Sequence, residues 1–119
     1  MDQRRAAGAD AERRAAQALE RGGLRIVERN VRFRGGEIDL VCRDGEAWVF
    51  VEVKARRPGW DAGAAAAVSW QKQQRIVRLA QLYLKSRGLR DARCRFDVVE
   101  VTLGDGLRHL VSAFDASSR

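Results

Sequence analysis

An Asp-Gly dipeptide, Asp44-Gly45, divides residues 37–54 into two runs that are rich in valine and other β-formers. Asp-Gly between two such runs is among the strongest signals for a β-hairpin with a two-residue turn. If this dipeptide forms the turn, Arg43 lies directly opposite Glu46. The pattern therefore predicts an antiparallel hairpin and fixes which side chains share each face.

Side chains alternate between the faces of a hairpin, and opposed residues share a face. One face is wholly apolar and is expected to face the core; it contains Ile38, Leu40, Cys42, Ala47, Val49, Val51 and Val53. The other face contains Glu37, Asp39, Val41, Arg43, Glu46, Trp48, Phe50, Glu52 and Lys54. On it Glu37 lies opposite Glu52, an unfavourable pairing of like charges. Asp39 lies opposite Phe50, so three carboxylates and the Lys54 ammonium gather at one end.

The segments around the hairpin predict an α/β fold. The expected elements are helices over 3–21 and 69–87, the hairpin over 37–54, a loop over 56–68, and strands over 24–33, 94–103 and 107–114. Short connections make the first three strands an antiparallel meander, and the helical crossover makes the next pair parallel. The sequence thus predicts a single domain over 1–119, a mixed sheet with helices packed on it in the order α-β-β-β-α-β-β.

Positive charge is concentrated in one segment. The chain has a formal net charge of +7. Residues 53–95 contain 11 basic and 2 acidic side chains, whereas residues 1–52 contain 10 of each. A basic segment next to an acidic hairpin favours an acidic partner, and nucleic acid is the first expectation.

The acidic end of the hairpin is predicted to hold a divalent cation. Trp48 and Phe50 share its face, so a helix should partly cover the carboxylates, and partly buried carboxylates need a counter-charge. Oxygen ligands of this kind suit Mg²⁺ or Mn²⁺. In metal-assisted hydrolysis Asp39 and Glu52 would hold the cation, and Lys54 would orient water or stabilise developing negative charge. The alternative is a solvated face on which Lys54 neutralises one carboxylate.

At these residues the sequence resembles the PD-(D/E)xK nuclease superfamily. The matching elements are Asp39 and, on the next strand, Glu52-Val53-Lys54. More closely, the chain resembles the uncharacterised bacterial YraN-type family. The landmarks are GEIDLV, VFVEVKAR, the following Lys72 and RFDVV at 95–99. That family is itself similar to archaeal-type Holliday junction resolvases.

The resemblance implies a restriction-endonuclease-like fold and a set of site residues. Asp39 and Glu52 are carried over as metal ligands and Lys54 as the catalytic lysine. Glu12 matches the additional acidic residue of the resolvase-like branch. It also falls on the small apolar stripe expected for the first helix, although it could instead reach water at the edge of that stripe. Glu37 completes the expected catalytic set.

Basic residues after the hairpin are candidates for nucleic-acid binding. Arg56 and Arg57 lie in the expected loop, beside the acidic end. Lys72 is near the start of the second helix and either extends past the core to water or points towards the acidic patch. Arg75 and Arg78 are on the outer face of that helix, where a solvated face is the alternative to DNA contact.

Taken together, the sequence predicts a Mg²⁺- or Mn²⁺-dependent endonuclease acting on DNA, with branched or processed DNA as a candidate substrate. The alternative is a nucleic-acid-binding module that keeps the nuclease fold, lacks catalysis and acts with a partner. The charged start has no apolar signal region, and no run approaches a membrane span, so a cytoplasmic protein is expected. Analogy with resolvases implies a homodimer.

Overall fold

The computed structural model describes residues 3–56, 68–102, 104 and 106–116. Its elements are α1 (Gln3–Arg21), β1 (Arg25–Phe33), β2 (Gly36–Asp44), β3 (Ala47–Arg56), α2 (Trp70–Ser86), β4 (Cys94–Thr102) and β5 (Leu107–Phe114). The predicted element order and the α/β class are therefore confirmed, and the order is compatible with a restriction-endonuclease-like fold. Most of the predicted loop between β3 and α2 lies outside the described residues.

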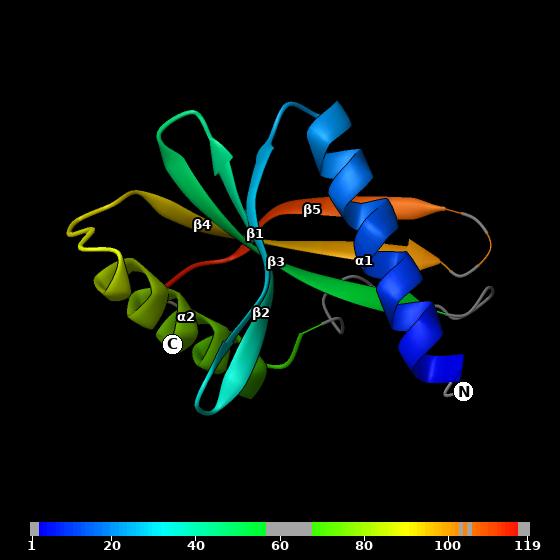
Figure 1. The fold of residues 1–119 in the computed structure, drawn as a ribbon, viewed down its shortest axis with the longest axis horizontal. Coiled ribbons are helices and arrows are strands. Elements are labelled where there is room, and N and C mark those ends of the chain that lie inside the picture. Colours follow the sequence, from blue (N-terminus) through cyan, green and yellow to red (C-terminus); the bar gives the residue numbers. More distant parts are fainter. Residues whose placement is uncertain (1–2, 57–67, 103, 105, 117–119) are drawn as a thin grey trace.

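The five strands form one sheet in the order β1-β2-β3-β4-β5 (Figure 1). The first three strands are antiparallel neighbours, β3 and β4 are parallel, and β5 returns antiparallel to β4. The chain passes from β3 to β4 through α2, as a parallel pair requires. The predicted meander and the predicted crossover pair are both present.

The two helices pack against separate parts of the core, and together they cover the sheet on both faces (Figure 1). α1 buries a stripe of small residues and one leucine: Ala11, Ala15, Ala16 and Leu19. α2 buries Ile76, Val77, Leu79, Ala80 and Tyr83. Since alanines have short side chains, α1 can lie close to the sheet. Neither helix, over the residues described, is long and apolar enough to cross a membrane.

The register of the β2–β3 hairpin differs from the prediction by two residues. The strands pair down to Asp44 and Ala47, so the turn lies one residue further along than the Asp-Gly signal predicts. Arg43 thereby faces Trp48, and its guanidinium lies 4.5 Å from the centroid of a Trp48 ring. Asp44 pairs with Arg95 of β4 at 2.7 Å. These contacts stabilise the observed register, and the local turn signal does not include them.

The corrected register changes the partners of the acidic residues. Phe50 faces Val41, and the last pair of the ladder is Leu40 with Val51. Asp39 and Glu52 follow that pair, and their side chains are in contact. The predicted pairing of Glu37 with Glu52 is therefore wrong. The change brings Asp39 and Glu52, the two expected metal ligands, together at the end of the ladder.

The alternation of β2 also breaks at Asp39. The sequence predicts Ile38 and Leu40 on one face, but Ile38 packs in the cluster under α2 and Leu40 in the cluster under α1. Asp39 lies opposite Asn30 of β1, which has a φ of 52°. Asparagine tolerates this left-handed backbone better than most residues. The irregularity therefore falls where β2 presents its central acidic residue.

Candidate functional site

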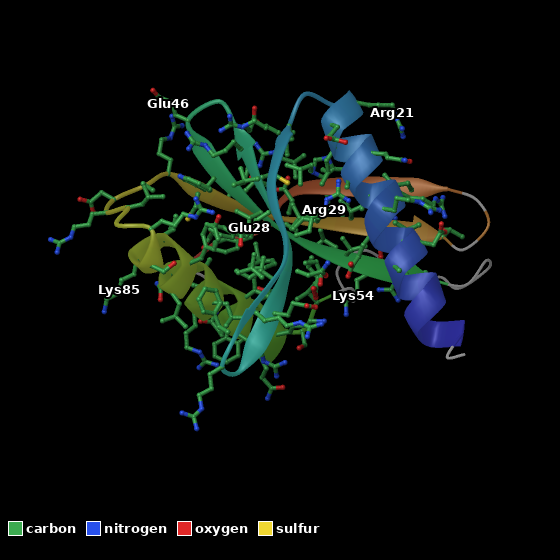
Figure 2. The ribbon with its side chains drawn as sticks, viewed as in Figure 1. Arg21, Glu28, Arg29, Glu46, Lys54 and Lys85 are labelled. Atoms are coloured by element: carbon green, nitrogen blue, oxygen red, sulfur yellow. The ribbon has the colours of Figure 1, made fainter. Side chains whose placement is uncertain are left out.

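The strands β2 and β3 separate at the position of the acidic residues. Their ladder ends at Leu40 and Val51. Beyond that pair, residues 36–38 continue beside β1 and residues 52–56 continue beside β4 (Figure 1). We call this point the fork site and define it by Glu12, Glu37, Asp39, Glu52, Lys54 and Lys72. Figure 2 shows Lys54 at this end of the hairpin and Glu46 at the opposite end, near the turn.

Three carboxylates of the fork site converge, one from α1 and two from β2. One oxygen each of Glu12, Glu37 and Asp39 lies within 4.8 Å of the other two. All three residues are half-buried. Glu37 also accepts a hydrogen bond from Arg32 Nε at 3.0 Å, on the exposed side of the hairpin. Three carboxylates at this spacing are an arrangement that a hard divalent cation can bridge.

Asp39 is the central residue of the cluster. Its Oδ2 accepts a hydrogen bond from the backbone N–H of Val53 at 2.8 Å, which ties β2 to β3 at the fork. Burial, contact with Glu52 and the charge of Glu12 raise the pKa of Asp39 to about 8, and the Val53 N–H only partly offsets them. The folded protein alone therefore disfavours the ionised form of Asp39.

Glu12 reaches the site from α1. Burial and the charge of Glu37 raise the pKa of Glu12, while a hydrogen bond with the Asn30 side chain lowers it. Asn30 is the residue of β1 whose left-handed backbone was noted above. No pattern in the sequence marks Asn30 as functional, because its contact is with a helix that is distant along the chain. The interpretation of Glu12 as a residue reaching only water is not supported.

Glu52 is paired with a lysine from α2. Lys72 Nζ lies 2.7 Å from Glu52 Oε2, and the Glu52 side chain is only 8% exposed. Lys72 is in the first turn of α2, where its backbone N–H donates to the Ser69 cap at 3.2 Å. Burial opposes the charged form of Lys72, but its contacts with Glu52 and Lys54 outweigh burial and raise its pKa. Of the two interpretations of Lys72, the structure supports the one in which it points towards the acidic patch.

Lys54 lies beside Lys72. Burial and the neighbouring Lys72 lower the pKa of Lys54, and this effect exceeds the opposing influence of Glu52 and Asp39. A lysine with a lowered pKa is more readily able to exchange a proton near neutral pH than an exposed lysine.

The fork site as a whole is short of positive charge. Its four carboxylates face two ammonium groups and, at Glu37, the guanidinium of Arg32. Full ionisation would therefore leave one negative charge unbalanced. One divalent cation would supply that charge, and carboxylate oxygens are the donors that Mg²⁺ and Mn²⁺ prefer. The residues present thus fit such a cation. A bound cation would also favour ionisation of Asp39, which burial now opposes.

The residues predicted to contact nucleic acid differ in how exposed they are. Arg75 and Arg78 are exposed on α2. Arg56 instead donates to Glu100 at 3.1 Å, and its side chain is only 18% exposed. Arg57 lies outside the described residues. The basic surface that continues from the fork site therefore runs along α2, whereas Arg56 is engaged within the protein.

A second buried carboxylate lies on β4. Asp97 is fully buried and accepts hydrogen bonds from Arg95 at 3.0 Å and from the backbone N–H of Ser112 at 3.0 Å. His109 Nε2 lies 2.7 Å from the same carboxylate. The contact with His109, to which the sequence assigned no role, was missed because it depends on how β5 pairs with β4.

Comparison with known proteins identifies the family to which this chain belongs. The model of the uncharacterised protein family UPF0102 matches residues 11–101. A UPF0102 protein of Dechloromonas aromatica is 53% identical over 111 residues, covering 93% of this chain and 90% of that protein. A UPF0102 protein of Serratia proteamaculans is 47% identical over 114 residues, covering 94% of this chain and 97% of that protein. One of Yersinia pseudotuberculosis is 51% identical over 110 residues, covering 91% of this chain and 93% of that protein. The YraN-type resemblance is thus confirmed, and the chain belongs to the uncharacterised protein family UPF0102.

Proposed function

We propose that this protein is a Mg²⁺- or Mn²⁺-dependent endonuclease that acts on DNA. The observation that carries the proposal is the convergence of four carboxylates and two lysines at the fork site, where the carboxylates outnumber the cationic side chains that reach them. The alternative is a nucleic-acid-binding module without catalysis. Such a module would have no need for carboxylates that lower its affinity for phosphate.

Each residue of the fork site has a role in the proposed reaction. Glu12, Glu37 and Asp39 would hold the cation, with Glu52 beside them. The bound cation would polarise a phosphodiester oxygen and favour ionisation of a water. Lys54 lies next to the carboxylates and would orient the attacking water or stabilise charge on the phosphate. The Val53 N–H holds Asp39 in place while these groups act.

DNA would approach along α2. This helix contains Lys72, Arg75, Arg78 and Lys85 and no acidic residue. Arg75 and Arg78 are exposed, and Lys72 reaches into the fork site from the same helix. Contacts between such side chains and phosphates make binding steeply dependent on salt. Since two cuts in a branched substrate require two sites, we also expect a homodimer.

Cleavage of a labelled DNA panel tests the proposal. The panel contains a duplex, a single strand, a flap and a four-way junction, each with Mn²⁺, with Mg²⁺ and with chelator. Asp39→Asn and Glu52→Gln are compared with Glu46→Gln, which changes an exposed acid at the far end of the same hairpin. We expect metal-dependent cleavage by the wild type and by Glu46→Gln, and none by the two fork variants.

The opposite result would support the binding module. In that case wild type and variants would all leave the panel intact while shifting the same DNA in a gel. An RNA version of the panel separates a deoxyribonuclease from a ribonuclease with the same site.

A further inference from the structure

We infer that Lys72 is a resident counter-ion of the fork site, which holds Glu52 while the site is free of metal and transfers to a DNA phosphate when a divalent cation binds. This inference rests on the proposed function. It gives Lys72 a role that differs from those of Arg75 and Arg78, because Lys72 would compete with the metal as well as bind DNA.

The geometry divides the expected metal ligands into two sets. Glu12, Glu37 and Asp39 lie together within bridging distance of one cation. Glu52 contacts Asp39, but one of its oxygens is 2.7 Å from the Lys72 ammonium. Glu52 is buried, so the Lys72 ammonium occupies an oxygen with which Glu52 would help the other three carboxylates to hold a cation.

The charges of the site favour an exchange of cations. Lys54 and Lys72 already lie close enough for each to affect the charge of the other. A divalent cation among the same carboxylates would add a third positive group, and like charges at short range in a partly buried site repel strongly. The ammonium that already occupies a carboxylate oxygen, that of Lys72, is then expected to leave.

Lys72 is the group that can move. It lies in the first turn of α2, its side chain is 35% exposed, and its four-carbon stem can rotate while the backbone stays capped by Ser69. Arg75 and Arg78 are exposed on the same helix. A released Lys72 ammonium would therefore join the basic surface on which DNA is proposed to lie, which couples metal loading to DNA binding.

Isothermal titration of the full chain with MnCl₂ at pH 8.5, without DNA, tests this competition. Lys72→Met is compared with the wild type and with Lys85→Met, which removes the same charge from the exposed far end of α2 (Figure 2). We expect Lys72→Met to bind Mn²⁺ several-fold more tightly than either. Its affinity for duplex DNA in Ca²⁺ should fall further than that of Lys85→Met. Circular dichroism confirms that each variant is folded, and Lys72→Gln serves as a second variant should Lys72→Met misfold.

Equal or weaker Mn²⁺ binding by Lys72→Met would overturn the inference and make Lys72 a residue that merely positions Glu52. The result is separable from the proposed function. Tighter Mn²⁺ binding in a protein that cleaves no DNA would uphold the inference while the nuclease proposal fails. If the wild type cleaves DNA but Lys72→Met binds Mn²⁺ with unchanged affinity, the nuclease proposal stands and the inference about Lys72 fails.

Discussion

Asp39 and Asp97 both lie on the central sheet, but the surroundings of their carboxylates differ. Asp97 is fully buried and is surrounded by Arg95, His109 and the Ser112 N–H. Asp39 receives one backbone hydrogen bond and otherwise faces other carboxylates. A buried carboxylate that has hydrogen-bond donors and a counter-charge within the protein stabilises the fold. A carboxylate without a counter-charge marks a place where a bound cation is expected.

The largest expected difference between the two aspartates is in activity. Asp39→Asn keeps the shape of the side chain but removes a charge that the cation requires. We expect cleavage to fall by about 10²-fold or more, with little loss of stability, because the change relieves repulsion among carboxylates. Single-turnover cleavage with Mn²⁺, together with urea denaturation, measures both effects. A variant that cleaves as the wild type does would contradict the assignment of Asp39.

Asp97→Asn should show the converse. It leaves Arg95 beside a neutral amide and replaces one acceptor oxygen of the network with an NH₂ donor. Breaking a buried charge pair in this way is expected to cost about 3 kcal/mol of unfolding free energy. Urea denaturation of this variant, with cleavage measured at a temperature where it stays folded, separates the two regions. Unchanged stability would mean that the Asp97 network does not support the fold.

The pH dependence of stability sharpens the comparison. The pKa of Asp39 is raised to about 8 in the folded protein, whereas an unfolded aspartate titrates near about 4. The folded state therefore holds a proton that the unfolded state releases, so this contribution to stability is fully present below pH about 4 and is lost as pH rises towards 8. We expect urea denaturation in chelator to show this decline in the wild type and a smaller decline in Asp39→Asn. Parallel curves for the two proteins would contradict it.

The smallest effect is expected at Asn30. Asn30→Gly keeps the left-handed backbone without strain but removes the hydrogen bond to Glu12. Loss of a residue that orients a ligand typically weakens metal binding about tenfold. Mn²⁺ titration of Asn30→Gly against the wild type tests this. An unchanged affinity would show that Glu12 is held by α1 alone.

Much of the fold follows from local sequence signals. The Ala-rich first segment forms a helix over the predicted residues, and Ser69 caps α2 as its position indicates. The hairpin register did not follow, because it depends on Arg43 stacking on Trp48 and on Asp44 pairing with Arg95. The Asp-Gly signal specifies neither contact: the first depends on side-chain stacking across the hairpin, and the second on a residue of β4.

The sequence predicts which residues form the candidate site better than it predicts the contacts among them. The clustering of Asp39, Glu52 and Lys54 follows from placing two charged strand ends side by side. The ion pair of Lys72 with Glu52 and the contact of Asn30 with Glu12 depend on how the two helices pack. No pattern within one segment could specify these distances.

The most direct test of the central claim is a titration of the wild-type chain with Mn²⁺ at pH 8.5, with Asp39→Asn and Glu46→Gln measured beside it. We predict saturable binding by the wild type and by Glu46→Gln, and loss of that binding in Asp39→Asn. Equal binding by all three proteins would contradict the claim that the unmatched carboxylates of the fork site form a cation site.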